Sequence, residues 1–168
     1  MEFERLLQFA GPHLHLMVTT PGEATDFAWS LAGLGNRQVV VRVLRGHKMR
    51  TAPQLFDEFA AALQFPYYFG ENWNALLECV TDLGWLPDGA CVLLILNATQ
   101  LLENEPVESL AVFFDTLGVA AEEWTASENG PLERPGRPFH VVFQCSSAEE
   151  DAFLVRVHGA GSVLDRLR

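Results

Sequence analysis

The chain has 168 residues, of which 49% are hydrophobic and 20% charged, and its formal net charge at pH 7 is −11. This composition predicts one globular domain, and no segment approaches the roughly twenty consecutive apolar residues that a membrane span needs. The first residues lack a basic stretch followed by an apolar core, and the three cysteines have no metal-ligand spacing, which together predict a reduced, cytoplasmic protein.

The first part of the chain alternates strand-like and helical segments. Short apolar or alternating runs predict strands, and apolar residues that recur every three or four positions predict helices. Caps, turn residues and glycines set the boundaries, so Gly35 and Asn36 are expected to end the second helix. In chain order the predicted elements are a helix at 2–10, a strand at 13–18, a helix at 26–34, a strand at 39–44 and a helix at 51–63.

The same alternation continues beyond a loop at 66–71. The predicted elements are a helix at 72–83, a strand at 91–96, a helix from Asn104 that ends before Gly118, a long loop at 122–138, a strand at 139–143 and a terminal helix from Ala148, interrupted by Gly159 and Gly161. Continuous apolar strands separated by helices predict an α/β protein with a parallel sheet and right-handed crossovers. The strand at 13–18 is expected to pair with the strand at 39–44.

Acidic residues are concentrated in the middle of the chain. Between Thr51 and Glu133 there are fourteen Asp and Glu residues and no Lys, Arg or His. Four basic residues cluster just before this stretch, at Arg42, Arg45, Lys48 and Arg50. One interpretation is functional, because a negative electrostatic field attracts a cationic partner and repels nucleic acid. The other interpretation is that the surface is acidic only for solubility. The charge pattern alone supports these two interpretations about equally, and we expect no nucleic-acid partner.

Catalytic and metal-binding patterns are sparse. His13 and His15 would share one face of a strand, but without a third ligand an exposed sheet edge explains them better than a metal site. Glu78 and Asp82 form an i, i+4 pair, for which a charged surface patch is a simpler interpretation than acid–base chemistry. No glycine-rich phosphate loop and no catalytic triad is recognisable. We therefore expect no enzyme, no metal and no cofactor.

The stretch from Pro66 to Leu83 carries the clearest functional signal. Asn72 is expected to cap a helix by accepting a hydrogen bond from an N–H group of the first turn. One side of this helix is predicted to be buried, through Trp73, Leu76, Val80 and Leu83. The other side is predicted to be exposed, through Asn74, Leu77, Glu78 and Thr81. This mixture of side chains is typical of a binding surface.

The segment PYYFGENWNALLECVTDLGW, residues 66–85, resembles the inhibitory loop and second helix of the barstar-like family of intracellular ribonuclease inhibitors. A looser similarity, ENEPVESLAVFF at 103–114, resembles the last helix of the family, and the likeness spans about 39–145. The resemblance implies a two-layer α/β fold with a three-stranded parallel sheet. The N-terminal segment, which lies outside the resemblance, is interpreted as an added strand and helix that would give the sheet a fourth strand. The resemblance thus divides the single domain, 1–168, into an N-terminal strand–helix extension (1–36), a barstar-like core (37–146) and a C-terminal tail (147–168).

Carried over residue by residue, the resemblance implies a partner-binding set of Tyr68, Asn72, Asn74, Leu77, Glu78, Thr81 and Trp85. Glu78 and Asn74 stand where the family has aspartates, and Leu77 replaces a tryptophan. The implied function is an immunity-type inhibitor that inserts the loop and acidic helix at 66–85 into the active site of a basic ribonuclease. Two alternatives stay open, an acidic module that binds another cationic protein and an enzyme of unrecognised type.

Overall fold

Five parallel strands form the sheet in the computed structural model, which describes residues 3–34, 38–129 and 135–168. The strands are β1 (Leu14–Val18), β2 (Val39–Arg45), β3 (Ala90–Leu96), β4 (Phe139–Cys145) and β5 (Asp165–Arg166). Their spatial order is β2–β3–β4–β1–β5. β3 and β4 are buried along almost their whole length, as their continuous apolar sequences predict.

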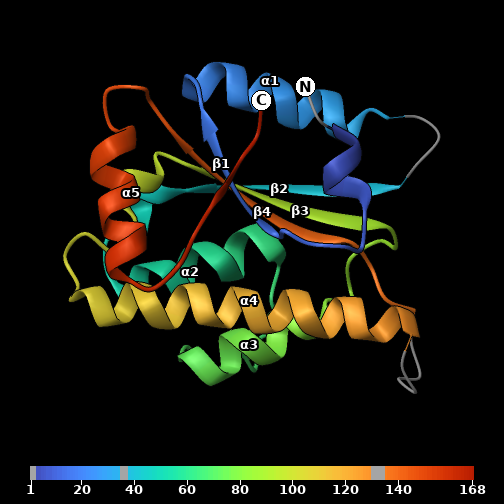
Figure 1. Ribbon diagram of the computed structural model, residues 1–168. Helices are drawn as coiled ribbons and strands as arrows, with labels where there is room; N and C mark the ends of the chain where they lie inside the picture. The colour runs from blue at the N-terminus through green and yellow to red at the C-terminus, as the bar shows by residue number, and fades with distance from the viewer. Residues whose placement is uncertain (1–2, 35–37, 130–134) are drawn as a thin grey trace.

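Helices cover both faces of this sheet (Figure 1). They are α1 (Pro21–Ala32), α2 (Ala52–Leu63), α3 (Trp73–Asp82), α4 (Val107–Asn129) and α5 (Glu150–Gly159), with short 3-10 helices η1 (Phe3–Leu7), η2 (Gly46–Lys48) and η3 (Ala98–Gln100). α1 lies on one face, and α2, α3 and α4 lie on the other. The β1–α1–β2 connection runs along the sheet in the opposite direction to the later connections. Because right-handed crossovers are the rule, opposite directions place their helices on opposite faces.

Two hydrophobic cores result, one on each face of the sheet. The larger core contains a group of aromatic rings centred on Phe143 of β4. Its ring centroid lies 5.2 Å from Phe114, 6.5 Å from Phe113 and 6.4 Å from Phe153. These contacts connect α4 and α5 to the middle of the sheet, and α3, which carries the candidate site, packs against α4, so the site rests on a rigid support.

The predicted three-stranded sheet is wrong, because the sheet has five strands. β1 was expected beside β2, but it lies between β4 and β5 and pairs with both. The local sequence pattern of a short apolar strand is the same whichever strands lie beside it. Its sequence therefore does not identify its neighbours in the sheet. β5 has only two residues and lay within the predicted terminal helix and tail.

The first long helix starts earlier than predicted. Thr20 is its N-cap, with the backbone N–H of Glu23 donating to the Thr20 hydroxyl and the Glu23 carboxylate accepting from the Thr20 N–H, and Pro21 occupies the first turn. The helix was predicted from residue 26, and it begins five residues earlier, at Pro21. The predicted stop at Gly35 and Asn36 lies outside the described residues.

α4 continues well beyond Gly118, where a stop was predicted. A Cβ at Gly118 would meet nothing within 4 Å, and the buried residues Ala120, Ala121 and Trp124 extend the apolar side of the helix. Burial of this side outweighs the low helix propensity of one glycine. The predicted loop at 122–138 is therefore helical up to Asn129, while 130–134 lie outside the described residues. No described helix combines the length and the apolar character needed to cross a membrane.

Candidate functional site

A loop and the first turn of α3 form one side of the candidate site. Asn72 caps α3, as predicted, because its Oδ1 accepts from the Ala75 N–H at 2.9 Å. Its Nδ2 donates to the Gly70 carbonyl at 3.1 Å, so one side chain connects the loop to the helix. At the other end, α3 stops at Leu83, whose φ is 47°.

Aromatic packing fixes the loop from below. The Trp73 and Phe56 rings are 5.0 Å apart, and Phe69 lies 6.2 Å from Phe56 and 4.9 Å from Phe65, in edge-to-face arrangements. Leu76 on the inner side of α3 is fully buried. Because these rings hold both the loop and the helix, the exposed side chains between them start from a well-defined backbone.

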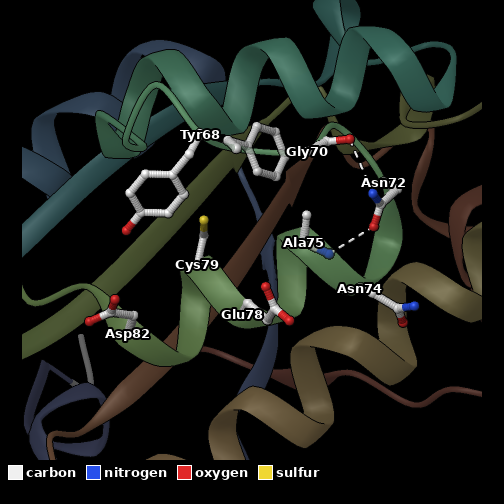
Figure 2. Close-up of a pocket in the computed structure, with 9 residues that line it drawn as sticks. Tyr68, Gly70, Asn72, Asn74, Ala75, Glu78, Cys79 and Asp82 are labelled. Carbon is white, nitrogen blue, oxygen red and sulfur yellow. Dashed lines mark hydrogen bonds between the residues drawn. The ribbon is translucent and has the colours of Figure 1, made fainter.

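A cavity of about 490 Å³ lies between this loop and α3 (Figure 2). Its lining consists of Tyr68, Phe69, Gly70, Asn72, Asn74, Ala75, Glu78, Cys79 and Asp82. In Figure 2 the Tyr68 ring extends from the loop, across the cavity from the helix that carries Glu78 and Asp82. Tyr68 is 66% exposed, and its neighbour Tyr67 is 100% exposed. Tyr68 thus stands in solvent at the cavity that the two carboxylates line, and Tyr67 packs edge-on against Tyr68 outside the cavity lining.

The cavity is electrostatically negative. Glu78 and Asp82 are exposed and one helical turn apart, and no lining residue is basic. Burial raises the pKa of the Cys79 thiol, and the carboxylates of Asp82 and Glu78 raise it further because a thiolate between them is disfavoured. The cavity therefore favours a positively charged group and disfavours an anion.

Four of the seven predicted site residues line this cavity, namely Tyr68, Asn72, Asn74 and Glu78. Leu77 does not, since it is only partly exposed and packs against the larger core. Thr81 is also partly buried, and its hydroxyl donates to the Leu77 carbonyl at 2.7 Å. Trp85 donates from Nε1 to the Leu63 carbonyl at 2.8 Å and stacks edge-on against Phe65, which gives it a supporting position below the loop.

Asp82 is the most important cavity-lining residue that the predicted partner-binding set did not include. The sequence contained its signal, because Glu78 and Asp82 are four residues apart and side chains with this spacing share a helix face. We interpreted the pair as a charged surface patch. The position of Tyr68 across the cavity shows that the two carboxylates belong to a concave surface. The sequence did not show this, because the spacing of residues along one helix does not reveal a side chain that approaches from a loop.

The predicted histidine pair has a different environment from the exposed sheet edge that we expected. His15 is fully buried on β1, and its Nε2 lies 3.0 Å from Nδ1 of His140, which is also fully buried. Burial lowers the pKa of each to about 4. The His13 ring centroid lies 5.2 Å from that of His140. Within the part of the chain that the structure describes, no group of three His, Cys, Asp or Glu residues is arranged to hold a metal ion.

The carboxyl ends of β1 and β4 are the usual ligand position in an open parallel sheet, because the following connections leave in opposite directions there. Here Gln144 joins the strands, with Nε2 donating to the Thr19 carbonyl at 2.7 Å and Oε1 accepting from the Asn97 N–H at 2.8 Å. The Glu23 carboxylate occupies the amino end of α1. A cavity beside β1 and β5 measures about 180 Å³, well below the roughly 300–1,000 Å³ of typical ligand sites.

Two solved structures resemble this fold. The ORC2 protein of Aeropyrum pernix, in ADPNP–ADP complexes, matches with a TM-score of 0.58 and 12% identity over 98% of this chain and 44% of that protein. Drosophila ORC bound to AT-rich DNA and Cdc6 matches with a TM-score of 0.46 and 12% identity over 90% of this chain and 47% of that one. The chain thus spans less than half of either protein. At these identities the first match shows a shared fold alone, and the second supports no further statement.

These comparisons correct the predicted function, an immunity-type inhibitor with a basic ribonuclease as partner and no nucleic acid. The structure that shares this fold, with a TM-score of 0.58, is an ORC2 protein and not a ribonuclease inhibitor. The inhibitor prediction rested on the motif at 66–85 and on the acidic stretch, and the same resemblance implied a three-stranded fold, whereas nearly the whole chain forms a larger, five-stranded one.

No curated protein matches the chain. One family model does, over residues 39–144, and its description is Barstar (barnase inhibitor). The matched range agrees with the resemblance at about 39–145, which is confirmed at the level of the family. Because the match covers more than half of the 168 residues, the chain belongs to the Barstar family.

Proposed function

We propose that this chain is a protein-binding domain that takes an arginine- or lysine-containing segment of a partner protein into the cavity between the loop at 66–72 and α3, without catalysing a reaction. The observation that carries the proposal is the convergence of Glu78, Asp82 and the exposed Tyr68 ring on one cavity. The partner is defined here by its chemistry, a cationic polypeptide segment.

A cation is the natural occupant of this cavity. A guanidinium group forms paired, charge-assisted hydrogen bonds with carboxylates, and an aromatic ring stabilises a cation placed over its face. Glu78 and Asp82 supply the carboxylates, and Tyr68 supplies the ring. The amide of Asn74 adds an acceptor for a remaining N–H group, while the Asn72 amide holds the loop to the helix. Since the loop is already held by packed aromatic rings, little ordering opposes binding.

The wider charge distribution supports the same partner class. The cavity lies within the stretch of fourteen acids without a basic residue, from Thr51 to Glu133. A field of this sign raises the encounter rate with a cationic protein and loses its effect beyond about 10 Å at 0.1 M salt. The acidic residues outside the cavity would therefore raise the association rate, and the residues that line the cavity would lower the dissociation rate.

The carboxyl edge of the sheet supports no comparable proposal. The Aeropyrum pernix structure contains ADPNP and ADP, and a nucleotide is the ligand expected at the switch point of an open parallel sheet. In this chain Gln144 and Glu23 occupy that position with their own hydrogen bonds. A second negative group beside Glu23 would meet like charge. The loop and α3 are therefore the better-supported location of function.

A peptide-binding experiment tests the proposal. Fifteen-residue peptides with two or three arginines would be compared with citrulline versions, which keep the shape and remove the charge. We expect arginine peptides to bind the full chain and citrulline peptides to bind at least about tenfold more weakly, the effect of about 1.4 kcal/mol. Peptides that bind equally in both forms would contradict the proposal.

Variants of the protein locate the binding. Glu78→Gln should lose on the order of 2–5 kcal/mol of binding free energy for a well-fitting partner, mostly through faster dissociation, because the bound cation loses one of its two carboxylates. Asp57→Asn removes the same charge from an exposed position of α2 outside the cavity and should change only the association rate, in a salt-dependent manner. Equal effects of the two substitutions on dissociation would place the interface elsewhere.

A further inference from the structure

β2 is an edge strand whose outer side has no partner strand among the described residues. It is the terminal strand of the sheet and pairs with β3 along its full length, from Val39 opposite Ala90 to Arg45 opposite Leu96. The other edge, β5, has only two residues. β2 therefore presents the one long edge of the described sheet, and such edges are templates for an added strand.

The hydrogen bonds around β2 indicate which backbone groups face outward. The Gln38 carbonyl accepts from the Ala90 N–H of β3, so even-numbered residues bond toward the sheet. The odd-numbered residues then direct their N–H and C=O groups away from the sheet. In agreement, the Arg45 N–H donates to the Glu58 carboxylate at 3.0 Å, and the Val41 carbonyl accepts from Nη1 of Arg42 at 3.2 Å.

The middle of this edge remains available. Val43 lies between these two capped positions, its side chain is 37% exposed, and no described residue bonds to its outward N–H and C=O groups. An arriving strand that extends toward Val41 must displace the Arg42 guanidinium from the Val41 carbonyl. A neutral strand would leave that guanidinium without its partner, whereas a strand with a nearby carboxylate would pair with it.

Basic side chains continue beyond the end of β2. A groove of about 650 Å³ is lined by Arg45, His47, Lys48, Arg50, Gln54, Asp57, Glu58 and Ala61. Arg45 is paired with Glu58 at 2.8 Å and Arg50 with Glu103 at 3.0 Å, but Lys48 has no carboxylate of the described residues within 4.0 Å. An acidic residue that follows the added strand would meet Lys48 in this groove.

We propose that the outer edge of β2 binds an extended, acidic polypeptide segment as an additional strand, with Arg42 and Lys48 selecting its carboxylates. The row of N–H and C=O groups at Val43 requires a polypeptide backbone, which a nucleic acid lacks. A second copy paired antiparallel through its own β2, centred on Val43, would make the two Arg42 side chains diagonal neighbours on one face, and these like charges repel. The proposal concerns a surface separate from the α3 cavity and does not depend on the function proposed for it.

Fluorescence anisotropy with a labelled nine-residue peptide that alternates valine and glutamate tests this proposal. The matched probes are the same peptide with glutamine in place of glutamate, and the glutamate peptide with N-methyl groups on alternate residues, prepared in both registers. We expect the glutamate peptide to bind, the glutamine peptide to bind at least tenfold more weakly, and one N-methyl register to abolish binding. Equal binding by both N-methyl registers and the parent peptide would overturn the proposal.

Variants then place the peptide on β2. Val43→Pro removes the outward N–H and should abolish binding, whereas Val43→Ala keeps it and should retain most of the affinity. Arg42→Gln should reduce the preference for glutamate over glutamine peptide without abolishing binding. Glu78→Gln, in the α3 cavity, should leave peptide binding unchanged, which distinguishes this surface from the other. Unchanged binding by both Val43→Pro and Arg42→Gln overturns the proposal.

Two other occupants are tested with the same full-length chain. Sedimentation equilibrium that shows a dimer dissociated by Val43→Pro would assign the edge to a second copy of the chain and overturn the peptide proposal. An AT-rich DNA duplex that competes with the acidic peptide, and whose binding is lost in Arg42→Gln but retained in Val43→Pro, would overturn it in favour of phosphate recognition.

Discussion

Mild acid should destabilise this protein through two buried histidines. His140 donates from Nε2 to the Gln8 carbonyl at 2.8 Å, so its Nδ1 is an acceptor for the Nε2–H of His15. The remaining nitrogen, Nδ1 of His15, has no hydrogen-bond partner and lies 3.6 Å from the Asp165 carboxylate, which is paired with Arg5. Additional protons must therefore enter a buried, fully packed cluster.

The magnitude follows from the pKa values. Burial, chiefly, lowers the pKa of His15 and of His140 to about 4, against about 6.5 in the unfolded chain. Between these values the unfolded chain binds more protons, so the free energy of unfolding decreases as the pH falls through this window. From pH 7 to pH 5 each histidine accounts for on the order of 2 kcal/mol, and the two together for on the order of 4 kcal/mol. That is a large part of the roughly 5–15 kcal/mol that stabilises a typical domain.

Urea unfolding at pH 7 and at pH 5, at constant ionic strength, measures this difference. His15→Gln keeps a donor for His140 and cannot titrate, so it should lose only about 2 kcal/mol over the same interval. His158→Gln removes an exposed histidine and should behave like the unmodified chain. The comparison uses the change with pH, so any fixed cost of the substitution cancels. If His15→Gln and the unmodified chain lose the same free energy, the buried cluster is not the origin of the acid sensitivity.

Two further predictions concern packing and capping. Trp124→Ala should reduce the free energy of unfolding by about 3–5 kcal/mol, because it leaves a cavity in the core and removes the hydrogen-bond donor of the Val80 carbonyl. The control Trp29→Ala, at a 75% exposed position, should change the free energy of unfolding by no more than about 0.5 kcal/mol. Equal effects of the two substitutions in urea unfolding would contradict this prediction. Asn72→Ala should cost about 1 kcal/mol of stability through the lost cap. Asn74→Ala, on the exposed side of α3, should leave stability unchanged and weaken only the binding of arginine peptides; loss of stability in both variants would remove capping as the explanation.

Elements with their own local signals could be predicted from the sequence. Asn72 identified the start of α3 because its side chain bonds within the first turn, and Thr51 did the same for α2. β2 and β3 were recognisable from their apolar composition. These interactions connect residues that are close along the chain, so a linear pattern contains them.

Features that depend on distant contacts could not be predicted in the same way. α4 passes Gly118 because Trp124 reaches the Val80 carbonyl, 44 residues away. β5 exists because the Leu167 N–H donates to the Leu16 carbonyl, and the two residues of the strand have no pattern of their own. For the same reason the position of Tyr68 opposite Glu78 was not apparent, although both residues were named as site residues.

The central position of β1 has a consequence for synthesis of the chain. β1 is made early, but its partner β4 lies about 125 residues later, as the His15–His140 contact illustrates. At about 5–20 residues per second, roughly 6–25 s separate the emergence of the two strands. During that time the apolar strand has neither neighbour, and β2 and β3 can pair first. The sheet would therefore be completed only when β4 and β5 pair with β1 on its two sides. Before that pairing, the apolar β1 strand is exposed, and the nascent chain most depends on protection from aggregation.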